Sequence, residues 1–197
     1  MNLHSQHLVI DTETLALRDN AIVLSIAVTP FKFNESNVTY DELVERSFFV
    51  KLDAKAQGKK GRIADANTLK WWGEQPETSK VFAFNKSKED VEPREGLIQL
   101  KKYIKENTEY SRNNSYVFER GMGYDTNKLD SLCEMYGLDC PLNLWRAREL
   151  RTINDLVGDV DNGKWELPEG RPHNFIEHHA LHDAALDAFR LIKMFSI

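Results

Sequence analysis

The sequence predicts a single α/β domain, residues 1–197, with a mixed five-stranded sheet flanked by helices. Three apolar, β-branched segments come first, at residues 8–14, 21–31 and 47–52, and their short connections predict an antiparallel meander. Segments with helical periodicity then alternate with two further short strands, which predicts parallel additions to the same sheet. A chain of 197 residues suits one domain with a sizeable core.

Local signals set the predicted boundaries in the first half of the chain. Segment 21–31 ends near Pro30, and Asp65-Ala66-Asn67 predicts the cap of a helix through TLKWWGEQ that ends near Pro76. A longer helix is capped by Ser87 or Asp90 and runs to about Asn107. Its core-facing residues are expected to be Leu97, Leu100, Tyr103 and Ile104.

The second half of the chain predicts strand–helix alternation. The expected elements are a strand at 116–119, a helix from about 125 to 136 that Gly137 ends, a strand at 143–146, a helix at 149–157, a loop at 168–172 and a last helix at 179–195.

Composition excludes several classes of protein. The hydrophobic fraction of 41% and the charged fraction of 29% are ordinary for a water-soluble domain, and no apolar run approaches the ~20 residues of a membrane span. The first 14 residues lack the features of a signal peptide. Cys133 and Cys140 are not spaced as a metal knuckle, so we expect a reduced, cytoplasmic protein without a membrane partner.

The net charge of −5 argues against bulk electrostatic binding to nucleic acid. A local basic patch is nevertheless present between residues 51 and 62, and its glycines predict a mobile, exposed loop. An alternative of equal weight is that these charged residues serve only to keep the protein soluble. The patch consists of Lys51, Lys55, Lys59, Lys60 and Arg62, with Gly58 and Gly61 between them.

Two acids end the first predicted strand, in the stretch LVIDTETLAL at residues 8–17. Side chains at i and i+2 share one face of a strand, so Asp11 and Glu13 lie side by side. Like charges this close disfavour ionisation of one another, and a cation such as Mg²⁺ or Mn²⁺ removes that cost. A turn in which these residues leave the strand and cap the next segment is the alternative.

Asp125 follows a short strand in the stretch GMGYD, residues 121–125. The two glycines allow a close backbone approach or a positive φ. The position just beyond a strand is where open α/β sheets place ligands. An ordinary helix N-cap explains Asp125 alone.

The stretch EHHALHDAALDAF, residues 177–189, contains half of the six histidines in the chain. A solvated helix start explains the acids but not the histidines. His178 and His182 are spaced like the ligands of an H-E-x-x-H zinc site, but His179 stands where such a site needs glutamate. His179 and Asp183 are also four residues apart and could form a simple pair.

Taken together, these motifs resemble those of DEDD-type 3′–5′ exonucleases of the histidine subclass. Asp11-x-Glu13 resembles the first motif, Asp125 after Gly-Met-Gly-Tyr the second, and His178 with Asp183 the third. The motifs occur in the required order. The resemblance implies a ribonuclease-H-like fold, consistent with the predicted mixed sheet. His182 stands where many of these enzymes have aspartate, at a position that is not a ligand.

Further segments resemble phage exonuclease A and the related bacterial exoribonuclease-like group, over about residues 8–190. These segments are TLKWWGEQP at 68–76, Gln-Gly-Lys-Lys-Gly-Arg at 57–62, Arg148-Glu-Leu-Arg-Thr152 and Leu-Pro-x-Gly at 167–170.

The resemblance implies a two-metal mechanism. Asp11, Glu13, Asp125 and Asp183 are expected to hold two Mg²⁺ or Mn²⁺ ions about 4 Å apart. His178 is expected to accept a proton from the attacking water. Four carboxylates and two divalent ions balance in charge, so a protein with a net negative charge can still process the 3′ end of a single strand. The products would be nucleoside 5′-monophosphates.

Substrate contacts are expected from Thr12, Trp71, Trp72, Lys59 and Arg62. Adjacent helix positions lie about 100° apart, so one tryptophan ring is expected to pack in the core and the other to stack on a base. Arg148 and Arg151 would serve the site or a homodimer contact, or would simply carry surface charge.

Single-stranded DNA is the predicted substrate, although recognition of the RNA 2′-OH leaves no readable mark in this sequence. Three alternatives remain open: an exoribonuclease with the same mechanism, a non-catalytic nucleic-acid-binding module on the same fold, and another metal hydrolase that uses the histidine cluster.

Overall fold

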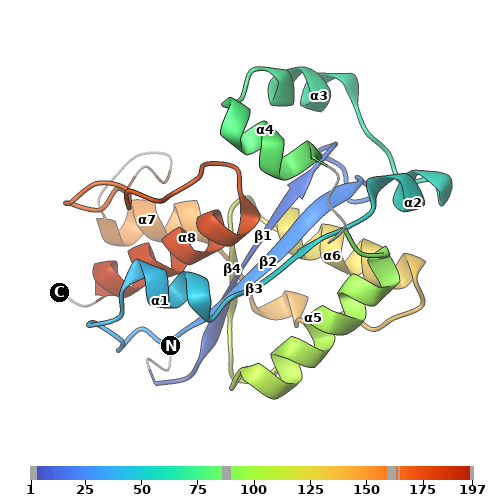
Figure 1. Ribbon diagram of the computed structural model, residues 1–197. Helices are drawn as coiled ribbons and strands as arrows, with labels where there is room; N and C mark the ends of the chain where they lie inside the picture. The colour runs from blue at the N-terminus through green and yellow to red at the C-terminus, as the bar shows by residue number, and fades with distance from the viewer. Residues whose placement is uncertain (1–3, 86–89, 159–162, 164, 196–197) are drawn as a thin grey trace.

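The computed structural model describes residues 4–85, 90–158, 163 and 165–195. The centre of the molecule is a five-stranded sheet in the order β3-β2-β1-β4-β5. Figure 1 shows this sheet between two layers of helices, with α2, α3 and α4 beyond one end of it. The predicted α/β class, with a mixed sheet flanked by helices, is confirmed.

The first three strands form the predicted antiparallel meander. They are β1 (His7–Thr14), β2 (Val23–Phe31) and β3 (Phe48–Lys51), and a register shift follows Glu13 in the β1–β2 pair. On the other side of β1, β4 (Val117–Glu119) and β5 (Ala147–Glu149) add in parallel. Strand β1 is therefore the central strand, and both of its faces are covered.

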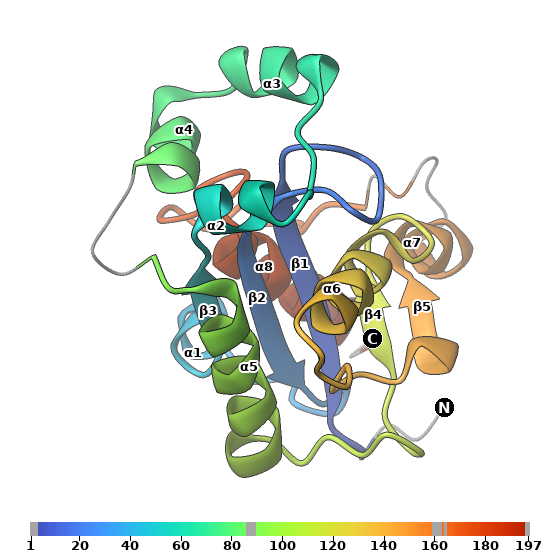
Figure 2. The ribbon, with the colours of Figure 1, turned by 90° about the vertical axis from the view of Figure 1, so that its right-hand side faces the viewer.

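Two helical layers bury the two faces of the sheet. One consists of α1 (Tyr40–Glu45), α7 (Leu150–Gly158) and α8 (Ala180–Phe195), which share a core cluster with Val9 of β1. The other consists of α5 (Pro93–Asn107) and α6 (Tyr124–Met135), which share a cluster with Leu8 and Ile10. In Figure 2, α5 and α6 lie in front of the sheet and α8 lies behind it. The alternation of Leu8, Val9 and Ile10 between clusters follows from the two-residue period of a strand.

Three short helices stand at the end of the sheet where β1 finishes. They are α2 (Ala54–Lys59), α3 (Ala66–Gly73) and α4 (Glu77–Phe84). Asp65 caps α3, as predicted, by accepting a hydrogen bond from the Thr68 backbone N–H at 2.8 Å. A small third cluster, in which Trp72 is central, packs α3 and α4 against the loop after β1.

Several predicted boundaries were wrong. Segment 54–59 is a helix capped by Asp53, not a loop. Helix α5 begins at Pro93 and is capped by Glu92, not by Asp90; the other predicted cap, Ser87, lies outside the described residues.

The last predicted strand also lies further along the chain. The Asn143 side chain accepts a hydrogen bond from the Trp145 N–H, which closes a 3₁₀ turn at Leu144–Arg146, and β5 starts only after it. Helices α1 and α4 were not predicted. Among the described residues, no helix has both the length and the hydropathy needed to cross a lipid bilayer.

Candidate active site

The site begins where β4 leaves the sheet beside β1. Their pairing ends at Val9, so the backbone N–H of Thr12 has no β4 carbonyl opposite it. The Thr12 N–H donates instead to Oδ1 of Asp125 at 2.9 Å, and the Thr12 hydroxyl donates to the same oxygen at 2.6 Å. Asp125 is thereby fixed against β1. Asp11 and Glu13 alternate with Thr12 and share the strand face of Val9, which is the face covered by α8.

Buried Glu119, at the end of β4, shapes the loop that presents Asp125. Its carboxylate accepts hydrogen bonds from the backbone N–H groups of Gly123, Asp125 and Thr126 and from the Thr126 hydroxyl, at 2.9–3.0 Å. Gly121 and Gly123 have φ angles of 94° and 88°, values that other L-residues adopt only with strain. The glycines in GMGYD therefore allow the chain to turn sharply from β4 into α6.

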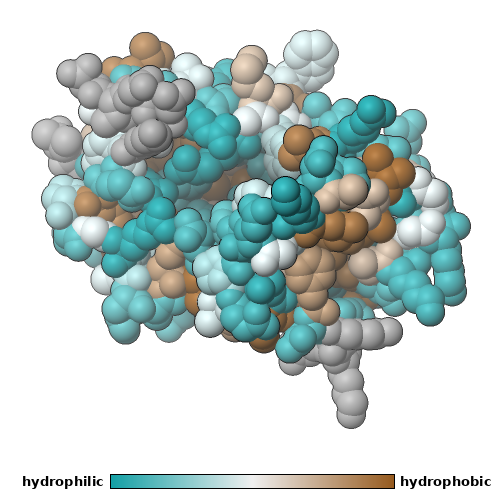
Figure 3. All heavy atoms as spheres, turned by 90° about the horizontal axis from the view of Figure 1, so that it is seen from above, coloured by the Kyte–Doolittle hydropathy of each residue, from teal (hydrophilic) through white to brown (hydrophobic). Residues whose placement is uncertain are grey.

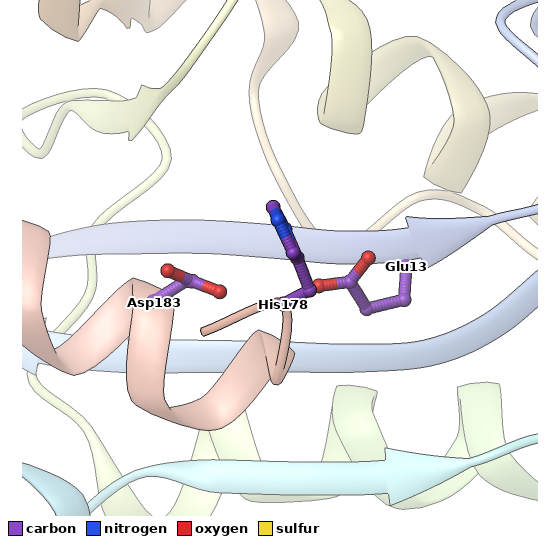
Figure 4. A group of neighbouring side chains, drawn as sticks. All are labelled: Glu13, His178 and Asp183. Carbon is purple, nitrogen blue, oxygen red and sulfur yellow. The ribbon is translucent and has the colours of Figure 1, made fainter. Parts of the chain in front are cut away.

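The turn before α8 supplies the histidine, and the first turn of α8 supplies the fourth acid. His178 has a φ of 56°, and the backbone N–H of His179 donates to Asp183 Oδ2 at 3.2 Å. One nitrogen or oxygen atom from each of Glu13, His178 and Asp183 lies within 4.8 Å of the others. Figure 4 shows the three side chains together, Glu13 from β1 and the other two from the turn and the start of α8.

All five predicted catalytic residues line one cavity of about 660 Å³. Its floor is the end of β1, and α3, α6 and the turn before α8 contribute the walls. Viewed from this end of the molecule, the surface is mostly hydrophilic and its hydrophobic areas are separate patches (Figure 3). The cavity residues include Asp11, Thr12, Glu13, Asn67, Thr68, Trp71, Arg120, Tyr124, Asp125, Arg151, His178 and Asp183.

Burial raises the pKa values of all four carboxyl groups. Desolvation is the largest cause in each case, and it raises the pKa of Asp11 and Glu13 well above their ordinary values. The pKa of Asp125 and that of Asp183 are each raised to about 7. Charge on each of the other three acids further raises the pKa of Asp11, because these groups are close together.

This donor set fits hard divalent cations. Buried carboxylate oxygens that repel one another are the ligands that Mg²⁺ and Mn²⁺ prefer. The cavity lining includes Arg120 and Arg151, but the Arg120 guanidinium is bound in a bidentate pair to Asp187, with both distances at 2.6 Å. Two divalent ions would neutralise the four carboxylates, and neither arginine alone can do so.

Sequence reasoning missed Arg120, Tyr124, Asn67 and Thr68 as cavity residues. Arg120 precedes GMGYD and Tyr124 lies inside it, so their nearness to that motif was the only available signal. The Tyr124 hydroxyl lies 3.0 Å from that of Thr14, at the end of β1. No local pattern marks Asn67 and Thr68, because they reach the cavity only through the packing of α3.

The two tryptophans of α3 divide as expected, and the structure assigns each ring. Trp72 is 1% exposed and donates from Nε1 to the carbonyl of Thr14 at 3.0 Å, so its predicted substrate contact is wrong. Trp71 is 41% exposed and lines the cavity. Its ring centroid lies 4.7 Å from that of His178, in an edge-to-face arrangement.

The predicted phosphate contact of Arg62 is also wrong. Arg62 is 3% exposed, and its guanidinium donates hydrogen bonds to the carbonyls of Ala21 and Asp19. These hydrogen bonds hold the loop between β1 and β2. Lys59 is exposed on α2 but does not line the cavity.

The two arginines of the Arg148-Glu-Leu-Arg-Thr152 segment differ in their position relative to the cavity. Arg151 lines the cavity, whereas Arg148 stacks over the ring of Tyr116 with its guanidinium carbon 4.4 Å from the centroid.

The adjacent tryptophans offer a matched pair of substitutions. We expect Trp72→Ala to lower the free energy of unfolding by about 3–5 kcal/mol, because it empties a buried site and removes a hydrogen bond. Trp71→Ala is expected to change that energy by less than about 1 kcal/mol and to raise KM, since it removes ~1–3 kcal/mol of base stacking. Urea denaturation and steady-state kinetics on both variants test this. Equal destabilisation by the two substitutions would contradict it.

The sheet order and the acids and histidine gathered at the end of β1 define a class of protein: a DEDD-type 3′–5′ exonuclease of the histidine subclass, with a ribonuclease-H-like fold. The particular family is given by a model described as the 3′–5′ exoribonuclease Rv2179c-like domain, which matches residues 6–192. The chain belongs to this family.

A phage relative agrees with that assignment, and a solved nuclease domain shares the fold. The exodeoxyribonuclease of Enterobacteria phage T4 is 32% identical over 199 residues, covering 91% of this chain and 84% of the phage protein. The nuclease domain of 3′hExo, a DEDDh family member solved with rAMP, is 13% identical with a TM-score of 0.60, covering 99% of this chain and 94% of that domain.

A larger protein shares the same fold. E. coli exonuclease I, solved with a dT13 oligonucleotide, is 13% identical with a TM-score of 0.54. The match covers 97% of this chain but spans only 40% of the length of exonuclease I.

Proposed function

We propose that the protein hydrolyses single-stranded DNA from its 3′ end and releases nucleoside 5′-monophosphates. The observation that carries this proposal is the convergence of four carboxyl groups, two of them buried and two half-buried, and one imidazole on a single cavity. The identity of 32% to a phage exodeoxyribonuclease favours DNA. The family description, an exoribonuclease, makes single-stranded RNA the second candidate.

Asp11, Glu13, Asp125 and Asp183 would hold two divalent ions, Mg²⁺ or Mn²⁺. The chemistry that such ions supply is polarisation of the attacking water and neutralisation of charge at the departing 3′ oxygen. The protein contributes preorganisation. Because Thr12 fixes Asp125 with two hydrogen bonds, the carboxylates of β1 and α6 keep a constant spacing.

His178 would accept the proton of the attacking water at a ring nitrogen. Burial lowers the pKa of His178 below its ordinary value, so the imidazole is neutral at pH 7 and can take up a proton. Its position, with a ring nitrogen within 4.8 Å of oxygens of Glu13 and Asp183, is suitable for a water that lies between them.

The substrate strand would enter the cavity past α3. Trp71 would stack on a terminal base, and Thr12 would contact the last nucleotide from the strand end, where it already lines the cavity. Lys59, on exposed α2, would meet only a more distant phosphate. A homodimer and a cytoplasmic location remain predictions.

End-labelled oligonucleotides test this function. Single-stranded DNA and RNA of one sequence, each labelled at the 5′ or the 3′ end, are incubated with the protein in Mg²⁺, Mn²⁺ or EDTA. We expect a metal-dependent ladder from 5′-labelled strands and immediate release of labelled mononucleotide from 3′-labelled strands. The Asp11→Ala variant, prepared identically, controls for contaminating nucleases.

The same assay separates the two substrates and the rival classes. Faster digestion of RNA than of DNA would show that RNA, not DNA, is the preferred substrate. Persistence of all strands in every metal would contradict the exonuclease proposal. Digestion that EDTA does not stop would contradict the metal-dependent mechanism.

A further inference from the structure

The turn that carries His178 is held in an unfavourable backbone conformation. A φ of 56° is uncommon for a residue other than glycine and is energetically unfavourable. Such a conformation persists only where neighbouring groups hold it. The direction of the His178 imidazole depends on this turn, so the contacts of the turn determine whether the ring faces the carboxylates.

Helix α4 makes one of these contacts, from nearly a hundred residues earlier in the sequence. Ser79 has 0% of its surface exposed, and its hydroxyl donates to the carbonyl oxygen of Glu177 at 2.6 Å. That carbonyl belongs to the peptide unit joining Glu177 to His178. The hydrogen bond therefore restrains rotation of the peptide immediately before the histidine.

Helix α3 contacts the same histidine through its rings. Trp71 lies against the imidazole, and the ring centroid of Trp72 is 6.2 Å from it. Trp72 is in turn hydrogen-bonded to the carbonyl of Thr14, next to Glu13. Helices α3 and α4 thus connect the end of β1 to the turn before α8, and Ser79 is the member of this connection that fixes the backbone.

We propose that Ser79 is a positioning residue for the hydrolysis reaction, acting through the peptide of Glu177 to hold the His178 imidazole toward the carboxylates. This inference rests on the proposed role of His178 as proton acceptor. Ser79 does not line the cavity, so it has no substrate contact of its own. Its loss is expected to alter kcat and to leave KM nearly unchanged.

A double-mutant cycle tests the proposal. We expect Ser79→Ala to lower kcat about tenfold in the otherwise native protein, with KM within about twofold, and to change kcat less than twofold in a His178→Ala background. Ser79→Thr, which keeps the hydroxyl, should restore kcat to within about threefold. Thermal denaturation of each variant confirms that it is folded at the assay temperature.

Ser115→Ala is the matched control. Ser115 is 1% exposed and its Oγ accepts a hydrogen bond from Ser111, but it lies just before β4, at the opposite end of the sheet from the site. The Ser115→Ala substitution should lower the free energy of unfolding about as much as Ser79→Ala does, without lowering kcat. An equal loss of kcat from Ser79→Ala in both backgrounds, or no loss in either, would overturn the positioning role. Native activity in His178→Ala alone would instead refute the proton-acceptor role itself.

Discussion

The kcat of the His178→Ala variant is expected to fall by about a hundredfold to ten-thousandfold, with the metal requirement retained. The reason is that a positioned general base contributes this range to the rate of hydrolysis, whereas the four carboxylates are untouched by the substitution. Single-turnover hydrolysis of a 5′-labelled strand at saturating protein isolates the chemical step from product release. At saturating Mg²⁺, which keeps the carboxylates ionised, the pH profile should lose its acidic limb, because a residue that must be neutral to accept a proton is no longer present.

The neighbouring histidine provides the control. His179 is 7% exposed, its ring stacks on Phe49 at a centroid distance of 4.7 Å, and burial lowers its pKa to about 4. His179→Phe keeps a ring in this apolar position and is expected to change kcat less than about threefold. A loss of activity in His179→Phe as large as that in His178→Ala would favour a different hydrolase that uses the whole histidine cluster.

The second large effect is expected from Asp125→Asn, which should stabilise the metal-free protein while lowering kcat about a thousandfold. The loss follows because correctly placed metal ions contribute several kcal/mol to the transition state. The stabilisation follows from the pKa of Asp125, which burial raises from 3.8 to about 7. Between those two pH values the folded protein binds a proton that the unfolded chain has released, so the free energy of unfolding falls as pH rises.

Removal of the carboxylate charge therefore has its largest effect on the free energy of unfolding above pH 7. At pH 8 without metal, the free energy of unfolding of Asp125→Asn should exceed that of the native protein by on the order of 2 kcal/mol. Near pH 4 the two should be nearly equal, because Asp125 is then protonated. The amide oxygen can still accept the hydrogen bonds of Thr12.

Urea denaturation at pH 4 and pH 8, in EDTA and in excess Mg²⁺, measures both effects. The native protein should gain more stability from Mg²⁺ than the variant does, since ions that bind only the folded state stabilise it. A variant that is less stable than the native protein at pH 8 in EDTA would show that Asp125 is not a strained, charge-repelled carboxylate.

The first four strands and the acids were readable from the sequence because each depends on local pattern. Strand β1 is an apolar run whose alternate residues enter two clusters, and Asp11 and Glu13 share a face by the same period. Helix α4 was missed because Pro76 was interpreted as the end of α3, although proline is compatible with the start of the next helix. Helix α1, only six residues long, is too short for a periodicity to be visible.

The side chains that were misplaced depend on packing between distant segments. Nothing near Arg62 shows that its guanidinium lies under the loop between β1 and β2, and nothing near Trp72 shows that it reaches Thr14. The bidentate pair of Arg120 with Asp187 joins residues 67 positions apart. Such contacts form between residues far apart in the sequence and depend on the tertiary structure. Composition and motif spacing indicate only how residues near one another in the sequence are arranged.

The order of the site residues along the chain has a consequence for when the enzyme becomes active. His178 and Asp183 belong to the turn before α8 and to its first residues, and α8 follows all five strands in the sequence. On the proposed roles of His178 and Asp183, a polypeptide still emerging from the ribosome is expected to have no working hydrolytic centre until α8 has been made and has docked on β1 and β2. Partial synthesis, or proteolytic loss of the segment from residue 177 onward, is therefore expected to leave a product without nuclease activity.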